Sequence, residues 1–503
     1  MKKRYGALLI IPLLIIVIFS VIKTPSLGEE KELDEVIEKY IKTYKIPGIE
    51  VAVAKGDKII FSRGFGTTPE GTEVTADTPM YIGSVSKSFT SLAVLQLAEN
   101  GKIDLDSPVI EYLPWFKVKG FGASRITVRH LLNHTSGLAE ETYFPELPVN
   151  TSLEAAVREL AEAEIVEEPG KEFNYFNPNY QVLGLIIEKV SGISYDEYVK
   201  KHILEPLSMK NTYLNKEEIE KKVTKGYGSF FGFPFTKKEP FRPYGLPEGY
   251  IVSTANDMIL FLQAHSNLDT DLNQKILSQD GFKLLQTPDS GGKSNYAMGW
   301  QRIKSSKGYT VIYNGGDLDT YHSDIMIIPE KGYGIVIMAN QNSFINQSVV
   351  YDSLRKAVID FVLGNEERQI MPEIHKHLII AGICIAAVIA YQLYLLLLIG
   401  KWAQKSKHRR RTGIILSVFK DCCIPVILLI VIPKILSVLL ERRVNLREAF
   451  NMQPDVTISI VIISILSCIK AIAKIAVIAR TIMFAERQES LATIAMEPNT
   501  EGK

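Results

Sequence analysis

The sequence predicts an α/β fold of the α+β sandwich type, in which an antiparallel sheet is flanked by helices and an all-helical lobe lies beside it. Residues 29–366 show strand patterns at both ends and helical patterns in the middle. The two ends can therefore form one sheet layer, and the middle can form the lobe. Apolar segments of lipid-spanning length follow residue 366, so we expect C-terminal transmembrane helices after this fold.

The first elements of the sheet layer are predicted near the start of this region. Glu29–Lys45 has the spacing of an amphipathic helix that ends before Pro47. Two runs rich in β-branched residues then surround Lys55-Gly56-Asp57-Lys58, a pattern typical of a β-hairpin. A further helix is expected over Ser84–Asn100, because Gly101 supplies a stop signal.

The middle and the end of the region differ in their patterns. Helices are expected at Thr127–Asn133, Thr151–Ala163 and Tyr180–Val190. From Tyr309 onward, "YTVIYNGG", "DIMIIP" and "GYGIVIMANQ" are typical of successive strands separated by turns. Ser348–Leu363 is expected to close the region as a helix.

The N-terminal segment, residues 1–28, has the pattern of an export signal. Lys2, Lys3 and Arg4 precede an apolar run from Ala7 to Ile22. A cleaved signal peptide and an uncleaved signal anchor both fit this pattern, and either one exports the residues that follow.

Three transmembrane helices are expected within residues 367–485, at about 378–400, 420–440 and 456–478, followed by a polar tail at 486–503. The loop after the first of them is strongly basic between Lys401 and Arg411, which places it in the cytoplasm. Residues 29–366 are then extracytoplasmic in a multi-pass protein of the cell membrane. Three arginines near residue 445 also fall outside, which weakens the charge rule without reversing it.

Two lysines of the last expected span, Lys470 and Lys474, lie one helical turn apart. They can face a partner helix, or the helix end can lie at the membrane interface. We prefer the interfacial interpretation.

Composition excludes several functions. The formal net charge of +1 gives no reason to expect nucleic acid as a partner. All four cysteines lie in the C-terminal membrane region, so the exported part has no disulfide, thiol nucleophile or thiolate zinc site. The histidines are scattered and no H-E-x-x-H motif occurs, so we expect neither a metal nor a cofactor.

Ser84 and Lys87 form a Ser-x-x-Lys pair at the head of the predicted helix 84–100. The pair alone says little, because the chain contains six such pairs. A spacing of three residues puts both side chains on one helix face, and the first turn offers free N–H groups to a developing oxyanion. A buried lysine can lose its charge and accept the proton of the serine. We therefore consider Ser84 a candidate nucleophile and Lys87 its base.

A second motif, Tyr175-Phe176-Asn177, stands in a polar turn just before the helix 180–190. A tyrosine beside an ammonium can serve as a general acid or base, and the amide of Asn177 can hold a substrate. Packing of Tyr175 at the turn is the alternative.

Five segments occur in one order and together resemble a known family. They are "IGSVSKSFTSLAVLQLAENGKIDLDSPV", "ITVRHLLNHTSGL", "FNYFNPNYQVLG", "ILEPLSMKNTYL" and "STANDMILFL". They resemble the serine beta-lactamase-related family, which includes class C beta-lactamases, low-molecular-weight penicillin-binding proteins and related esterases. The resemblance covers about residues 34–363 and implies the beta-lactamase/transpeptidase-like fold.

The resemblance also implies roles for single residues. It makes Ser84 the nucleophile that forms an acyl-enzyme, Lys87 its proton acceptor, Tyr175 the catalytic tyrosine and Asn177 a substrate-orienting residue. The third motif of the family, Lys-Thr-Gly or His-x-Gly, is matched by "YNGG" at 313–316.

In this match Tyr313 takes the place of a lysine or histidine, so Tyr313 and Gly315 are expected to bind substrate. The backbone N–H groups of Ser84 and Gly316 are expected to form the oxyanion hole. Tyr313 carries no positive charge near pH 7, which favours an ester or uncharged amide over efficient beta-lactam hydrolysis. His322 can substitute for the missing cation, but we prefer a surface histidine at a strand end. His134 is expected to be structural.

The expected function is a membrane-anchored serine hydrolase that acts through an acyl-enzyme on a D-alanyl peptide, D-alanyl ester or related amide or ester of the cell envelope. Its expected partners are this substrate, beta-lactams and membrane lipid. A penicillin-binding or wall-fragment-binding sensor or scaffold with little turnover is the alternative. Substrate identity and oligomeric state stay open.

Overall fold

The computed structural model describes residues 32–140, 143, 147–266, 276–288, 294–305, 307–364, 374–406, 410–431 and 453–495, with isolated positions between 433 and 450. The described residues form two compact units, one that ends at His375 and one that begins at Lys376. The expected export signal at 1–28 lies outside the described residues.

A seven-stranded antiparallel sheet organises the first unit, with strand order β2-β1-β11-β10-β9-β8-β7. Its strands are β1 (Gly48–Lys55), β2 (Lys58–Gly66), β7 (Tyr296–Ala297), β8 (Trp300–Lys304), β9 (Thr310–Asp317), β10 (His322–Ile328) and β11 (Tyr333–Ala339). β1 pairs with β11, so the two ends of the region build one sheet, as the sequence predicts.

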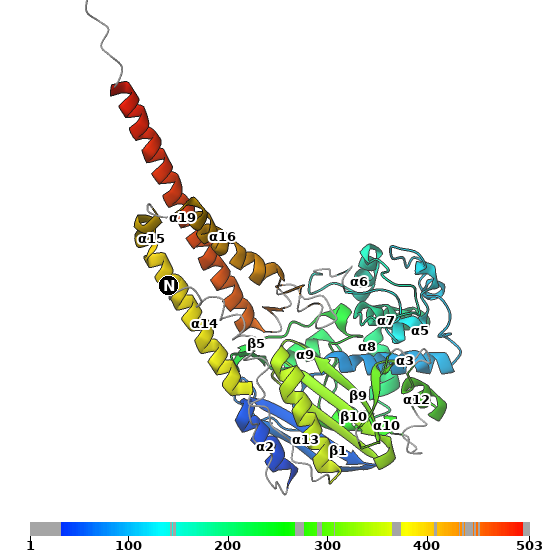
Figure 1. Ribbon diagram of the computed structural model, residues 1–503. Helices are drawn as coiled ribbons and strands as arrows, with labels where there is room; N and C mark the ends of the chain where they lie inside the picture. The colour runs from blue at the N-terminus through cyan, green and yellow to red at the C-terminus, as the bar shows by residue number, and fades with distance from the viewer. Residues whose placement is uncertain are drawn as a thin grey trace, which may run out of the picture. The chain divides into compact units, whose positions relative to one another are not determined.

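Each face of this sheet is covered by helices because side chains alternate along the strands. Val51 and Val53 of β1 face α2 (Leu33–Tyr44) and α13 (Asp352–Val362), while Ala52 and Ala54 face the larger core. The larger core includes α3 (Ser86–Glu99) and α10 (Ala255–His265). Figure 1 shows α2 and α13 together on one face of the sheet.

The helical lobe lies between β2 and β7 in the chain (Figure 1). Its α-helices are α4 (Val109–Tyr112), α5 (Val128–Leu132), α6 (Leu153–Glu159), α7 (Pro178–Ser191), α8 (Tyr195–Val199), α9 (Lys216–Lys222) and α12 (Gln279–Leu285). Short 3₁₀ and π segments join them: η1 (Gly83–Val85), η2 (Ala123–Arg125), η3 (Leu160–Glu162), η4 (Lys200–Leu204) and η5 (Pro243–Gly245). Two-stranded sheets are formed by β3 (Met80–Tyr81) with β6 (Val252–Ser253) and by β4 (Gly226–Phe230) with β5 (Phe233–Lys237).

The expected elements of the first unit are present within a few residues of their predicted bounds. The sequence did not predict the strands β3 to β8, each of which is only two to five residues long. The final helix is preceded by a π segment, η7 (Asn346–Tyr351), and η6 (Pro329–Lys331) turns the chain between β10 and β11.

The second unit holds three helices that are long and apolar enough to cross a membrane, Lys376–Leu397, Arg411–Val431 and Pro454–Gln488. They belong to α14 (Ile374–Leu397), to α16 (Arg411–Val426) with η8 (Ile427–Val431), and to α19 (Pro454–Ala495). α15 (Ile399–Ser406) follows the first of them. α19 continues into the segment expected to be a polar tail.

The second candidate span begins at Arg411, whereas we expected it at about 420. The charges of Lys420 and Asp421 interrupt the apolar pattern in the sequence. Asp421 is buried and contacts Lys470 at 3.1 Å and Lys474 at 2.7 Å. The two lysines therefore face α16, and the preferred interfacial interpretation is wrong for the described part of the chain.

Candidate functional site

Ser84 lies in η1, the single 3₁₀ turn that leads into α3. The turn needs Gly83, which has φ +51° and leaves no room for a side chain, because a Cβ there would lie 2.5 Å from the backbone nitrogen of Asp317. Amides of a first turn have no partner in a preceding turn. The Ser84 amide is thus available to a substrate oxygen.

Lys87 stands one turn further along the same helix face and is only 1% exposed. Its ammonium nitrogen donates to Ser84 Oγ at 3.0 Å, to Asn177 Oδ1 at 2.7 Å and to the carbonyl of Glu248 at 2.7 Å. All three acceptors are neutral. An ammonium has three N–H groups, so these contacts use its whole donor capacity.

Tyr175 completes the group from the opposite side. Its hydroxyl donates to Ser84 Oγ at 2.8 Å, and its ring lies 5.0 Å from the Lys87 nitrogen. The side chain is 37% exposed, so the phenol lies at the mouth of the site and not in the core. The structure thus brings Ser84, Lys87, Tyr175 and Asn177 together.

His134 supports the turn that carries Tyr175. Its Nδ1 accepts the backbone N–H of Phe176 at 3.1 Å, and its ring contacts that of Tyr175 at a centroid distance of 4.3 Å. Burial, aided by the charge of Lys87, holds the pKa of His134 well below its usual range, so the imidazole stays neutral. The structural interpretation of His134 agrees with these contacts.

Glu248 was not singled out in the sequence, yet it adds a second titratable group behind Lys87. Gln181 donates to its Oε2 at 3.1 Å. Burial raises the pKa of the Glu248 carboxyl to about 7, although Lys87 and Gln181 oppose that shift. Its backbone carbonyl, by contrast, holds Lys87 directly, a contact that no sequence motif reveals.

The strand β9 closes the site on its other side through Asn314. The amide of Asn314 donates to the carbonyl of Ser84 at 3.2 Å and to Ser88 Oγ at 3.0 Å. Gly316 packs so closely on the preceding turn that a Cβ would lie 1.9 Å from the oxygen of Ile82. β9 therefore touches the nucleophile turn at Asn314 and Gly316.

Tyr313 lies on the opposite face of the sheet, away from Ser84, which differs from our expectation. Its hydroxyl donates to Gln301, and the guanidinium of Arg355 lies 5.2 Å from its ring. The reason is strand alternation: Tyr313 follows Val311 toward α13, while Asn314 follows Ile312 toward α3. Asn314, one residue later, thus occupies the position next to the nucleophile that we expected for Tyr313.

The same alternation decides which β9 amides face the substrate. Ser305 N–H donates to the carbonyl of Tyr309, so odd-numbered residues of β9 turn their backbone groups toward the β8 side. The pairing of β8 with β9 ends at Gln301 and Tyr313, which leaves Gly315 and Asp317 on an edge that β8 does not cover. Gly316 instead turns its backbone groups toward its β10 neighbour, Ser323. The amide beside Ser84 is therefore that of Asp317 and not that of Gly316.

His322 is buried, not a surface residue as we preferred, and it binds two carboxylates. Its Nδ1 lies 2.8 Å from Asp317 Oδ1 and its Nε2 lies 3.2 Å from Asp324 Oδ2. Burial alone would lower the pKa of His322, but the two carboxylates outweigh burial and raise it to about 9. Arg355 also contacts Asp324, at 3.2 Å. The imidazolium of His322 holds the side chain of Asp317, and its two partners are carboxylates and not the hydroxyl of Ser84.

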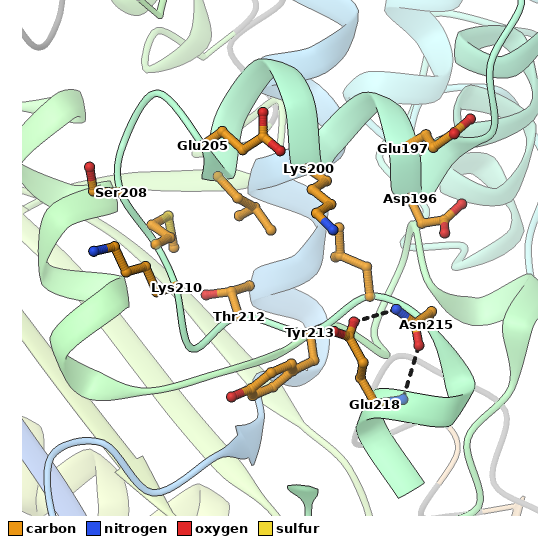
Figure 2. Close-up of a pocket in the computed structure, with 13 residues that line it drawn as sticks. Asp196, Glu197, Lys200, Glu205, Ser208, Lys210, Thr212, Tyr213, Asn215 and Glu218 are labelled. Atoms are coloured by element: carbon orange, nitrogen blue, oxygen red, sulfur yellow. Dashed lines mark hydrogen bonds between the residues drawn. The ribbon is translucent and has the colours of Figure 1, made fainter. Parts of the chain in front are cut away.

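A pocket of about 490 Å³ lies elsewhere, around α8, η4 and the loop before α9 (Figure 2). Its charges are mixed, with Glu205 and Glu218 near Lys200 and Lys210. The bonds drawn in Figure 2 join Asn215 and Glu218, which cap α9. Because none of the residues that converge on Ser84 line it, we assign it no chemistry.

Among the described residues, no group of three or more His, Cys, Asp or Glu side chains is placed to hold a metal ion. The groups that converge on Ser84 are an amine, a phenol, amides and the edge of β9.

Comparisons with known proteins identify the family of this chain. A family model described as beta-lactamase matches residues 33–357. The Staphylococcus aureus protein named flp is 30% identical over 320 residues, which are 62% of this chain and 64% of that protein. The chain thus spans less than two thirds of the length of this relative.

Solved structures share the fold. The octameric penicillin-binding protein homologue from Pyrococcus abyssi is 30% identical, with a TM-score of 0.58 over 67% of this chain and 78% of that one. FmtA from Staphylococcus aureus is 23% identical, with a TM-score of 0.55 over 70% of this chain and 94% of that one, and supports the fold alone. By the extent of the family match, the chain belongs to the beta-lactamase family of serine hydrolases.

Proposed function

We propose that this protein is a membrane-anchored extracytoplasmic serine hydrolase that acts through an acyl-enzyme on a D-alanyl peptide, a D-alanyl ester or a related amide or ester of the cell envelope. One observation carries the proposal: Ser84 Oγ lies within 3.0 Å of both the Lys87 amine and the Tyr175 hydroxyl. A serine without a catalytic role does not require an amine and a phenol within hydrogen-bonding distance of its hydroxyl.

Acylation begins when Ser84 Oγ attacks the carbonyl carbon of the substrate. In the resting arrangement both neighbours donate to Ser84, so one of them has to release a proton before the serine can lose its own. Neutral Lys87 then accepts the serine proton, and Tyr175, at the exposed side, passes a proton to the leaving amine or alcohol. Lys87 then returns its proton to Tyr175. Water attacks the resulting ester, one of its protons passes through Tyr175 or Lys87 to Ser84 Oγ, and the acyl group leaves as a carboxylic acid.

The oxyanion that forms in both steps needs donors. We propose the backbone N–H groups of Ser84 and Asp317 for this role, in place of the expected pair Ser84 and Gly316. Each such donor contributes about 3 kcal/mol to transition-state stabilisation. Asn314 holds the carbonyl of Ser84, so it fixes the turn that carries one of the two donors.

The substrate class follows from the charges near the edge of β9. Asn314, in contact with the Ser84 turn, is neutral, and Asp317 carries a carboxylate. β9 therefore offers no cationic side chain that could bind a carboxylate of the substrate. An ester or amide without a free carboxylate next to the scissile bond suits this edge better than a beta-lactam does. Gly315 lies on the edge of β9 that β8 does not cover, where an extended substrate backbone can pair.

Membrane anchoring is proposed from the three candidate spans, and the outer location of the hydrolase unit from the basic loop between the first two. The unit then faces the cell envelope, which is the source of the D-alanyl groups named above.

Labelling of the full-length protein with a fluorophosphonate tests the proposal. Wild type is expected to become labelled, and Ser84→Ala is expected to lose the label. Ser353→Ala is the matched control, because Ser353 heads another Ser-x-x-Lys pair but lies in α13, where it bonds Tyr40. A folded wild type that takes no label would falsify the proposal.

A binding or sensor protein with little turnover is the second candidate. Asn314, the residue of β9 that faces the nucleophile turn, is neutral. This favours the sensor, because a site without lysine or histidine at this position selects its substrate less strongly. Release of the label separates the two functions. An acyl-enzyme formed with a short acyl ester is expected to hydrolyse within minutes in a hydrolase and to persist for hours in a sensor.

A further inference from the structure

The hairpin formed by β4 and β5 exposes an unusual number of aromatic rings. Phe230, Phe233 and Phe235 are 40%, 49% and 38% exposed. Phe230 pairs with Phe233 and Phe235 pairs with Gly228, so the three rings lie on one face of the hairpin. Exposed apolar patches of this kind mark contact surfaces more often than isolated exposed side chains do.

The hairpin presents these rings from a fixed base. Phe231 and Gly232 both have positive φ, +47° and +81°, as the tight two-residue turn of a hairpin requires. At the base, Lys237 forms an ion pair of 2.6 Å with Asp319. The turn and the ion pair therefore hold the three phenylalanine rings in a defined position on the hairpin.

The segment that contains the hairpin carries charge of one sign, and the carboxylate of Asp319 that pairs with Lys237 lies outside this segment. Between Glu220 and Glu239 the sequence contains no acidic residue. Its lysines are Lys221, Lys222, Lys225, Lys237 and Lys238. The amine of Lys45, just after α2, adds a further positive charge 3.9 Å from the Phe233 ring centroid. Aromatic rings within a basic segment are the composition of surfaces that bind anionic membranes.

We propose that the β4–β5 hairpin docks on the lipid bilayer, with its phenylalanine rings in the boundary between headgroups and acyl chains and its lysines at anionic headgroups. This inference depends on the membrane anchoring proposed above. α13 ends at Val362 and the first candidate span begins at Lys376. The residues between them can extend over at most roughly 45 Å, which keeps the hydrolase unit within reach of the bilayer.

Docking has a consequence for the site. Asp319, which binds the base of the hairpin, follows the proposed oxyanion residue Asp317 by two positions. The five-residue strands of the hairpin are roughly 17 Å long, so a docked tip holds the site mouth near the membrane surface. Substrates attached to the bilayer or close to it would then reach Ser84 most easily.

Quenching of tryptophan fluorescence tests the docking. Full-length Phe233→Trp protein is reconstituted into vesicles of phosphatidylglycerol and brominated phosphatidylcholine, and its emission is compared with that in unbrominated vesicles after subtraction of the wild-type signal. Phe121→Trp is the matched control, because Phe121 is 89% exposed in the helical lobe. We expect about twofold quenching at position 233 and almost none at position 121.

Equal emission of the Phe233→Trp protein in both vesicles would overturn the proposal, as would equal quenching at both positions. A soluble partner protein on the hairpin predicts the first of these results. Vesicles without phosphatidylglycerol are expected to reduce the quenching at position 233, since the lysines then lose their anionic partners. The quenching measurement does not require catalysis, so its outcome is independent of fluorophosphonate labelling of Ser84.

Discussion

Among the residues that the structure describes, two lysines are almost completely buried, and their surroundings differ in one respect. Lys87 of α3 is 1% exposed and Lys470 of α19 is 3% exposed. Lys87 donates only to neutral oxygens, those of Ser84, Asn177 and the Glu248 backbone. Lys470 donates to a carboxylate, that of Asp421, at 3.1 Å.

This difference distinguishes an amine that can take part in proton transfer, that of Lys87, from an amine with a structural role, that of Lys470. A carboxylate in contact with an amine favours the charged form strongly, because Coulomb attraction grows in a low-dielectric interior. Lys87 contacts the hydroxyl of Ser84, with which it can exchange a proton, whereas the contact of Lys470 with Asp421 holds α16 and α19 together.

The largest expected effect is that of Lys87→Met. The substitution removes the proton acceptor and leaves Ser84 beside Tyr175 alone, so acylation is expected to fall by about 10³-fold or more. The rate of fluorophosphonate labelling measures the effect. Lys470→Met should label at the wild-type rate, and equal losses in the two variants would show that burial alone, and not the acceptors, matters.

Asp421→Asn is expected to act on stability and not on labelling. It leaves Lys470, which is buried, and Lys474, which is partly buried, without their common carboxylate, at a cost of about 3 kcal/mol. Thermal unfolding of full-length protein in detergent should show an earlier transition. Adding Lys470→Met to this variant should recover part of the loss, because one uncompensated charge is then removed.

Asn177→Asp converts the surroundings of Lys87 into those of Lys470. The new carboxylate would lie where Asn177 Oδ1 now accepts at 2.7 Å and would hold Lys87 as an ammonium. We expect labelling at pH 7 to slow by about 10- to 100-fold, with a recovery at higher pH. Asn177→Ala provides the control, since it should slow labelling without moving the pH optimum.

His322 is a third buried cation, and His322→Asn extends the comparison to the sheet. Its folded-state pKa of about 9 exceeds the ordinary value of 6.5, so the stability it contributes is complete below pH 6.5 and is lost as the pH rises through about 9. The variant is expected to unfold about 1–3 kcal/mol more easily near pH 6, with a smaller difference at pH 10. Thermal melts across this range measure it.

His265 supplies a control of opposite sign. Burial lowers its pKa to about 4, and its Nδ1 lies 2.8 Å from the carbonyl oxygen of Phe261, a neutral partner. The wild type therefore loses stability as the pH falls from 6.5 toward 4. The stability difference between wild type and His265→Asn should shrink on acidification, and a difference that shrinks on alkalinisation would contradict the assignment.

Much of the fold and of the site could be predicted from the sequence, because the signals are local. Ser84 and Lys87 share a helix face through their spacing alone, and the hairpin at 55–58 follows from its turn residues. The stretch 175–177 was recognisable as a motif, and the structure brings it to Ser84. Periodicity was sufficient for the long helices and for β9 to β11.

The remaining features depend on contacts between distant segments. Tyr313 was expected in the site because the sequence does not fix which residues of β9 face α3, and a shift of one residue changes the face. The pairing with β8, which was not predicted, sets that register. Asp421 looked like an interruption of a span because its partners, Lys470 and Lys474, are far away in sequence. The Glu248 carbonyl has no sequence signature at all.

The close approach of Gly83 and Gly316 has a consequence for how this site can evolve. A Cβ at either position would meet backbone atoms at 2.5 Å or less, so no side chain fits without moving the nucleophile turn. Positions 83 and 316 should accept almost nothing but glycine in a saturation library selected for activity. At Gly315 a Cβ would meet a side-chain oxygen of Asp324 at 3.1 Å and a backbone oxygen of Ser323 at 3.9 Å, on the face of β9 that points away from Ser84, so this position is under a weaker steric limit than the other two.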